Sequence, residues 1–212
     1  MSAHRSTRVK SDPKVIEKAS KQLSWLLRHG AIESGLAMDA AGWAAIDDVL
    51  RATSLSRPEL DAVVRLNNKS RLEVRGDRIR ACQGHSREGV PVTLEALEVS
   101  WERYEGPESA WHGTNLVAAL AIAREGILPG ARTHVHLAPA TDSKVGKRAQ
   151  VDVLLEVGVD RLRAAGIGVF QSGNGVLLCR SVPPDCIVGL ELATVHGQRA
   201  EAMLRDAFGL PA

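Results

Sequence analysis

The sequence predicts an α+β protein: an N-terminal unit of three helices and a hairpin, then a unit of mostly short strands. The prediction rests on the apolar spacing, which is helical up to about residue 66 and alternates like a strand in much of the chain that follows. The length of 212 residues suits one large domain or two of about 100 residues each. With 44% hydrophobic and 25% charged residues, and no apolar run near the roughly 18 residues of a membrane span, the composition predicts a globular protein with no membrane partner.

The first unit is expected over residues 1–88, with 1–13 flexible. Residues 14–29 place apolar side chains at helical spacing and end at Gly30, and further helices are predicted over 46–53 and 57–66. Two alternating runs then flank Gly76-Asp77, a pair suited to a tight hairpin turn. Three helices followed by a basic hairpin are typical of a winged-helix module, which is a common nucleic-acid scaffold.

The second unit is expected over residues 89–212. The segment 83–92 has little periodicity and contains Gly84, Gly89 and Pro91, so it is predicted to be a linker between the units. One good helix is predicted over 116–124, stopping at Gly126. Short strands are predicted over 109–112, 134–137, 151–157, 169–170 and 175–178. The segment after about Ala193 carries no usable motif.

Charge and cysteine content narrow the classes of partner and ligand. Residues 1–88 carry a net charge of +5 and the remainder −3, and residues 65–87 hold seven basic against two acidic side chains, a concentration that attracts phosphates, although such a run is often only a solvated face. The first ten residues lack the apolar stretch of a secretory signal, and three cysteines are too few for a disulfide framework. We expect a cytoplasmic protein with reduced thiols.

Several short motifs have both a structural and a functional interpretation. Arg28-His29 at a helix end fits simple compensation of the helix dipole, and Lys69 with Arg71 fits either phosphate contact or solvation. The loops at 83–86 and 112–114 let the backbone approach a ligand closely, or are ordinary turns. His134-x-His136, with His112 or His85, invites a zinc interpretation; because neither CxxC nor HExxH accompanies it, we expect no metal.

Known nucleotide and nucleophile fingerprints are missing. The GK at 146–147 lacks the Walker context, GxGxxG does not occur, and the order Gln171-Ser172-Gly173 does not fit the GxSxG of serine hydrolases. Any nucleotide or phosphate chemistry must therefore use another arrangement of residues.

Taken together, the ordered motifs resemble the RNA 2′-phosphotransferase family. The resemblance runs from about Lys21 to Leu190 and is carried by these segments, in order: LSWLLRHG, GWAAIDDVL, NNKSRLEV, RIRACQGHS, WHGT, RTHVHL, VGKR and SGNGVLL followed by VPPDCI. It implies an N-terminal winged-helix lobe that binds RNA and a C-terminal lobe similar to the ADP-ribosyltransferase fold that binds NAD.

The resemblance implies a two-step reaction that consumes NAD and needs no metal. The RNA 2′-phosphate attacks the nicotinamide ribose and expels nicotinamide; the 2″-hydroxyl of the ADP-ribose then attacks the phosphate. The products are 2′-OH RNA and ADP-ribose 1″,2″-cyclic phosphate, and tRNA splicing is one setting for such a reaction. We expect a monomer.

The resemblance also assigns the site residues. Arg28, Arg71 and Arg148 would hold the phosphate, Lys69 would add a point charge, and His29 would either orient the phosphate or move a proton. The NAD side is expected to comprise nine residues: His112, Gly113, Thr114, Arg132, His134, Ser172, Asn174, Gly175 and Val176.

Three positions depart from the family pattern: Asn68 replaces a common acidic residue, Leu72 a frequent Phe and Cys82 a usual Asn. These put fine positioning in doubt and leave the basic residues in place. Two other functions remain open: an ADP-ribosyltransferase that caps phosphorylated nucleic-acid ends, and a non-catalytic winged-helix sensor of NAD or ADP-ribose.

Overall fold

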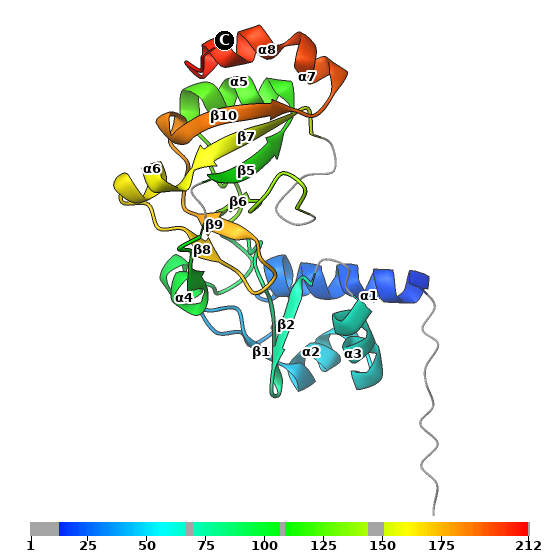
Figure 1. Cartoon of the computed structure of the whole chain (residues 1–212). Helices are drawn as coiled ribbons and strands as arrows, with labels where there is room; N and C mark the ends of the chain where they lie inside the picture. Colours follow the sequence, from blue (N-terminus) through cyan, green and yellow to red (C-terminus); the bar gives the residue numbers. More distant parts are fainter. Residues whose placement is uncertain (1–12, 67–69, 107–108, 144–150, 212) are drawn as a thin grey trace, which may run out of the picture.

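The computed structural model describes residues 13–66, 70–106, 109–143 and 151–211, and combines helices with antiparallel sheets (Figure 1). This confirms the predicted α+β class. Within the described part of the chain, no helix has the length and apolar character to cross a membrane.

The N-terminal half packs three helices against a small sheet. The elements are α1 (Pro13–Trp25), α2 (Ile46–Thr53), α3 (Arg57–Leu66), β1 (Ala44–Ala45), β2 (Leu72–Arg75) and β3 (Arg78–Ala81), and the strand order is β1-β3-β2. The hairpin β2–β3 pairs Val74 with Ile79, and Gly76 adopts a φ of +59° in its turn. Leu23, Val49 and Leu60 bring one side of each helix into a common core. The three predicted helices and the hairpin are confirmed.

The first helix differs from the prediction at its C-terminal end. It changes after Trp25 into a five-residue π-helical turn, η1 (Leu26–Gly30). The turn buries Leu26 and Leu27, and Gly30 lies under the indole of Trp25, where an added Cβ would come within 2.4 Å of the ring. Such wide turns are rare and are frequently found at functional sites. Apolar spacing alone does not distinguish this turn from a regular helical end.

The C-terminal half contains two further antiparallel sheets. One has the order β10-β7-β5, and the other β4-β8-β9-β6. Their strands are β4 (Glu102–Arg103), β5 (Ser109–Thr114), β6 (Val135–Leu137), β7 (Val153–Gly158), β8 (Phe170–Gln171), β9 (Leu177–Cys179) and β10 (Ile187–Leu192). The remaining helices are α4 (Leu94–Ser100), α5 (Leu116–Glu125), α6 (Val159–Ala164), the 3₁₀ turn η2 (Pro184–Cys186), α7 (Val195–Arg199) and α8 (Glu201–Ala207).

Helices α5, α7 and α8 lie on one side of the β10-β7-β5 sheet, at the top of Figure 1. Leu204 of α8 is fully buried in the C-terminal core. The segment after Ala193, which has no motif, therefore helps to complete that core. Strands near the predicted positions are confirmed, whereas α4, β4, α6, β10, α7 and α8 were not predicted.

The two halves meet at the segment 83–92. His85 and Val90 are buried, and the backbone of the segment is bonded to both halves: the Ser86 N–H donates to Arg28 O at 2.9 Å, and the Thr133 N–H donates to His85 O at 3.0 Å. A small apolar cluster around Leu97 and Trp101 lies alongside. The prediction of a linker over 83–92 is therefore wrong: the segment is a packed junction, because its side chains and backbone groups are bonded to or buried against both halves.

Candidate functional site

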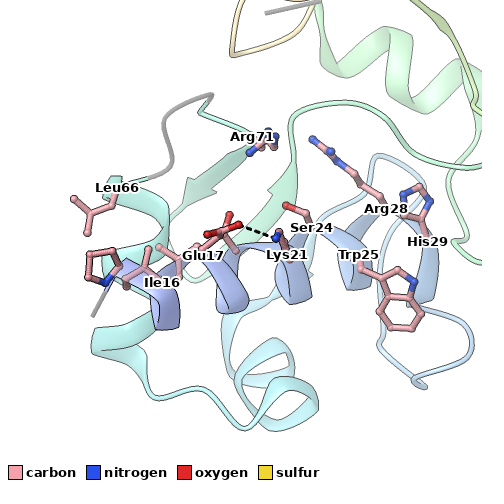
Figure 2. Close-up of a pocket in the computed structure, with 12 residues that line it drawn as sticks. Ile16, Glu17, Lys21, Ser24, Trp25, Arg28, His29, Leu66 and Arg71 are labelled. Carbon is pink, nitrogen blue, oxygen red and sulfur yellow. Dashed lines mark ion pairs between the residues drawn. The ribbon is translucent and has the colours of Figure 1, made fainter. Parts of the chain in front are cut away.

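Two arginines from separate elements of the N-terminal half point toward one another (Figure 2). Arg28 lies in η1, and its guanidinium passes over Gly84, where an added Cβ would lie 3.4 Å from Cζ; Gly84 has a φ of +90°. Arg71 directly precedes β2, and its carbonyl accepts a 2.9 Å hydrogen bond from the Cys82 N–H. The π turn, the hairpin and the junction segment therefore jointly position the pair.

The positive charge at this point has no compensating carboxylate among the described residues. Nε and Nη2 of Arg28 are buried without a hydrogen-bond partner, and within the same part of the chain no ion pair involves Arg28, Arg71 or Arg132. Burial, followed by repulsion from Arg71 and Arg132, lowers the Arg28 pKa to about 10. A buried cation without partners is unfavourable on its own. The arrangement is suited to an anion.

His29 follows Arg28 in η1 and is more exposed. Partial burial, together with the charges of Arg28 and Arg132, lowers the pKa of His29 below its ordinary value of 6.5. The imidazole is therefore mainly neutral near pH 7 and can accept or donate a hydrogen bond there.

A cavity of about 630 Å³, here called the cleft, opens on one side of Arg28 and Arg71. Its walls come from the junction segment, β5, the loop 127–132, β6 and the loop before β9. The predicted site residues that line it are Arg28, Arg71, His112, Gly113, Arg132, His134, Asn174 and Val176.

A second cavity of about 720 Å³, here called the α1 groove, lies along α1 and is closed by Val63 and Leu66 of α3 and by Arg71 (Figure 2). Arg28 and Arg71 line both cavities, and no other described residue does so. His29 lines the groove. The cation pair is therefore the meeting point of two cavities.

The other predicted residues do not line the cleft. Thr114 is buried, and its hydroxyl has no partner among the described residues. The Ser172 hydroxyl lies 2.9 Å from Asn174 Oδ1 and 3.1 Å from Val176 O, while Gly175 has a φ of +81°. Ser172 and Gly175 thus shape the loop that carries Asn174 and Val176. Lys69 and Arg148 lie outside the described residues.

A hydrogen-bonded chain in the cleft was missed by the sequence analysis. Arg132 Nη1 lies 3.5 Å from His136 Nδ1, and His136 Nε2 lies 2.9 Å from Gln83 Oε1. Burial and nearby Arg132 and Arg28 lower the His136 pKa to about 3, so the ring is neutral. Because arginine can only donate, Nδ1 accepts and Nε2 donates to Gln83. The Gln83 amide nitrogen is thereby left as a donor at the wall of the cleft.

A second set of contacts, made by Glu98 and Arg180, holds the ring of His134 in position. Its Nε2 lies 3.2 Å from Glu98 Oε1, and Arg180 binds Glu98 through contacts of 2.7 and 2.9 Å. His134 is fully buried, with its ring edge-on to Trp101 at 5.0 Å. Burial lowers the His134 pKa, although Glu98 opposes that shift. No sequence motif marks Glu98 or Arg180, because their pairing spans 82 positions.

Two of the three departures from the family pattern, Cys82 and Leu72, lie within the described residues. Burial, followed by repulsion from Glu73, raises the Cys82 pKa to about 11, so Cys82 is a thiol, and its Sγ donates to Ser70 O at 3.2 Å. Leu72 is buried in the N-terminal core. Asn68 lies outside the described residues. Within the described ranges, no cluster of three or more His, Cys, Asp or Glu side chains is arranged to hold a metal.

Comparison with known proteins agrees with this picture. Residues 14–181 match the family model described as RNA 2′-phosphotransferase, Tpt1 / KptA family. The chain is 37% identical over 185 residues to the probable RNA 2′-phosphotransferase of Pseudomonas savastanoi pv. phaseolicola, covering 83% of this chain and 95% of the relative. It is 40% identical over 183 residues to the protein so named in Streptomyces griseus, covering 79% and 93% respectively. The chain therefore belongs to the RNA 2′-phosphotransferase family.

Proposed function

We propose that the protein transfers an internal 2′-phosphate of RNA to the ADP-ribose part of NAD. The reaction passes through a 2′-phospho-ADP-ribosylated RNA and yields 2′-OH RNA, nicotinamide and ADP-ribose 1″,2″-cyclic phosphate. Family membership supports the removal of a 2′-phosphate from RNA. The observation that carries the proposal is the uncompensated pair Arg28 and Arg71 at the meeting point of the two cavities.

The cation pair suits a phosphomonoester. Such a group carries about 1.5 to 2 negative charges at pH 7, and a guanidinium can bind two of its oxygens at once. The Nε and Nη2 donors of Arg28 are buried and have no partner among the described residues, so a bound phosphate would supply acceptors for them. Arg71, on the opposite side, would share the charge that grows on the phosphoryl oxygens during transfer.

The cleft suits a dinucleotide as the second substrate. Its volume of about 630 Å³ lies within the usual range of about 300–1,000 Å³ for ligand pockets. Arg132 offers a cation for a pyrophosphate, and Asn174 and Gln83 offer hydrogen-bonding groups for the ribose or nicotinamide. Bound NAD would supply the electrophilic ribose carbon and a stable leaving group, nicotinamide.

His29 is placed to act on the phosphate or on its proton. It lines the α1 groove next to Arg28, and its lowered pKa keeps it neutral near pH 7. A neutral imidazole can accept the proton of an attacking hydroxyl. Lys69 and Arg148 are proposed to complete the phosphate contacts on the strength of the family resemblance.

The proposal also assigns a role to each half of the chain, together with the oligomeric state and the location of the enzyme. Residues 1–88 are proposed as a winged-helix RNA lobe and residues 89–212 as an NAD lobe of ADP-ribosyltransferase type, in a monomeric cytoplasmic enzyme that uses no metal. The helices and hairpin of the N-terminal half and the antiparallel sheets of the C-terminal half support this division.

The test is a reaction of purified protein with NAD and a short RNA that carries one internal 2′-phosphate, followed by mass spectrometry of the RNA and of the nucleotides. We expect loss of the phosphate with an equal amount of ADP-ribose 1″,2″-cyclic phosphate. The same RNA with a 5′-terminal phosphate instead is the matched control, and it should remain unchanged.

Each alternative function has a distinct outcome in this experiment. ADP-ribose retained on the 5′-phosphorylated control would favour the end-capping transferase. Intact RNA and intact NAD would overturn the proposal and favour a protein that only binds these ligands.

A further inference from the structure

The α1 groove has no part in holding NAD if the second substrate occupies the cleft, and its chemistry points to another ligand. One face of α1 forms its floor, and Val63 and Leu66 of α3 form an apolar wall (Figure 2). The volume of about 720 Å³ is that of a pocket for one small ligand and is too small for a nucleic-acid duplex.

The two cavities meet only at Arg28 and Arg71 in the described part of the chain. A 2′-phosphate is a branch on a ribose that is itself part of a chain. If the phosphate lies on the arginine pair and NAD fills the cleft, the ribose and its base must lie on the other side of the pair. That side is the α1 groove.

We propose that the α1 groove binds the phosphorylated nucleotide and its neighbour in a single-stranded stretch of the RNA. The inference rests on the proposed function and assigns the side of the cation pair from which the RNA approaches. It also restricts the substrate class, because the phosphorylated nucleotide must be unpaired to enter the groove.

The floor of the groove supports this assignment. Ser20 and Ser24 lie one turn apart on one face of α1, and both line the groove that leads to Arg28 in η1. The step from Ser20 to Ser24 rises about 6 Å along α1, and a stacked strand advances about 3.4 Å per nucleotide, so this step covers about two nucleotides. The two hydroxyls can therefore reach the sugar of the phosphorylated nucleotide and that of the next one.

The charged and apolar groups fit a nucleotide as well. Lys21 lies on the same floor, 77% exposed, and is linked to Glu17 by a 2.7 Å ion pair. Such exposed pairs are weak, so Lys21 can turn from Glu17 to a phosphodiester. Leu66 is 56% exposed at the wall, which leaves an apolar surface for the face of a base.

The decisive variants are Ser24→Leu, which fills the groove, and Lys21→Glu, which reverses a charge in it. We expect each to raise the KM for a single-stranded 2′-phosphorylated RNA at least tenfold and to leave the KM for NAD within twofold. Lys18→Glu is the matched control, because Lys18 is an exposed residue of α1 outside the groove. It makes the same change in net charge and should leave both constants unchanged.

A second measurement protects the test against misfolding. RNA binding is followed without NAD by fluorescence anisotropy of a labelled 2′-phosphorylated strand, with the melting temperature of each variant as a check, and Ser20→Leu replaces Ser24→Leu if the latter unfolds. The same strand annealed to its complement should bind at least tenfold more weakly to the wild-type protein.

The outcomes separate this inference from the proposed function. An active wild-type enzyme whose groove variants keep the wild-type KM for RNA, or which processes the annealed duplex equally well, would overturn the groove assignment alone. A wild-type protein that leaves the phosphorylated RNA and NAD intact would overturn the proposed function and the inference with it.

Discussion

Arg80 is a buried arginine of the N-terminal half and Arg28 a half-buried one with two buried nitrogens, and the surroundings of the two guanidinium groups are opposite. Arg80 is only 2% exposed and is fully partnered: Glu73 at 2.8 Å, Ser100 Oγ at 2.7 Å and the ring of Trp43 at 4.6 Å from its Cζ. Arg28 has two buried nitrogens without a partner among the described residues. Breaking a satisfied buried ion pair destabilises a fold, whereas buried donors without acceptors are groups that a bound ligand can satisfy.

The largest effect is expected where the missing ligand would bind. Arg28→Ala should lower kcat/KM for 2′-phosphorylated RNA about 10²- to 10³-fold, because it removes the donors that face the phosphate. Urea unfolding should show unchanged or increased stability, because a buried cation without partners is lost. A stability loss equal to that of an Arg80 variant would remove the distinction between the two arginines.

Replacing Arg80 should instead lower the free energy of unfolding. Arg80→Met should lower the free energy of unfolding by about 3 kcal/mol, because it breaks a buried ion pair and leaves Glu73 poorly compensated. Arg75→Met is the matched control: Arg75 binds the same Glu73 but is 68% exposed, so its loss should cost about 0–1 kcal/mol. Equal losses in the two variants would show that burial does not set the role of Arg80.

An added anion should stabilise the folded protein through Arg28 and not through Arg80, which already has partners. Inorganic phosphate at about 100 times its Kd should stabilise the wild-type protein by about 2.7 kcal/mol, since only the folded chain presents the arginine pair. Thermal melts at constant ionic strength, with chloride as the reference anion, would measure this. Stabilisation that persists in Arg28→Ala would place the phosphate elsewhere.

The smallest expected effect is on the pH dependence of stability and involves His85. The charges of both Arg28 and Arg80 act on this side chain. Burial, then Arg28 and Arg80, lower its pKa to about 3. The unfolded chain binds this proton near pH 6.5 and the folded chain does not, so the contribution to stability is complete above pH 6.5 and falls as the pH is lowered toward 3.

His85→Asn should therefore flatten the pH dependence of stability by about 1.4 kcal/mol per pH unit between pH 6 and 5. Urea unfolding of the wild-type and His85→Asn proteins at each pH gives the difference between their free energies of unfolding. The contribution of the carboxylates is the same in both proteins and cancels in this difference. Parallel curves for the two chains would show that His85 takes up its proton without unfolding.

Local features of this fold were predictable, and features that depend on distant partners were not. The helices α2 and α3 and the β2–β3 hairpin follow from periodicity and the turn at Gly76-Asp77. The strand β10 was missed because Gly189 and the irregular register between Ile187 and Gly189 interrupt its alternating pattern. The π turn was missed because its pattern of apolar residues is also that of an ordinary helix.

The candidate site shows the same division. The family motifs identified Arg28 and Arg71, which the fold brings to the same point. Neither motif nor periodicity indicated that Gln83 is oriented by His136, or that His134 is fixed by Glu98 and Arg180. Gln83 and His136 come from different halves of the molecule, and Glu98 is far from both His134 and Arg180 in the sequence. Only the folded chain brings these residues together.

The topology of the β10-β7-β5 sheet has a consequence for synthesis on the ribosome. The core around this sheet closes only when Ile187–Leu192 and Leu204 have been made, and β10 follows its partner β7 by about thirty residues. The β2–β3 hairpin of the N-terminal half, by contrast, pairs near neighbours in the chain, and such contacts form quickly. We expect the nascent β2–β3 hairpin to form early, while the edge of β7 that pairs with β10 stays open, and prone to aggregation, until β10 has been made.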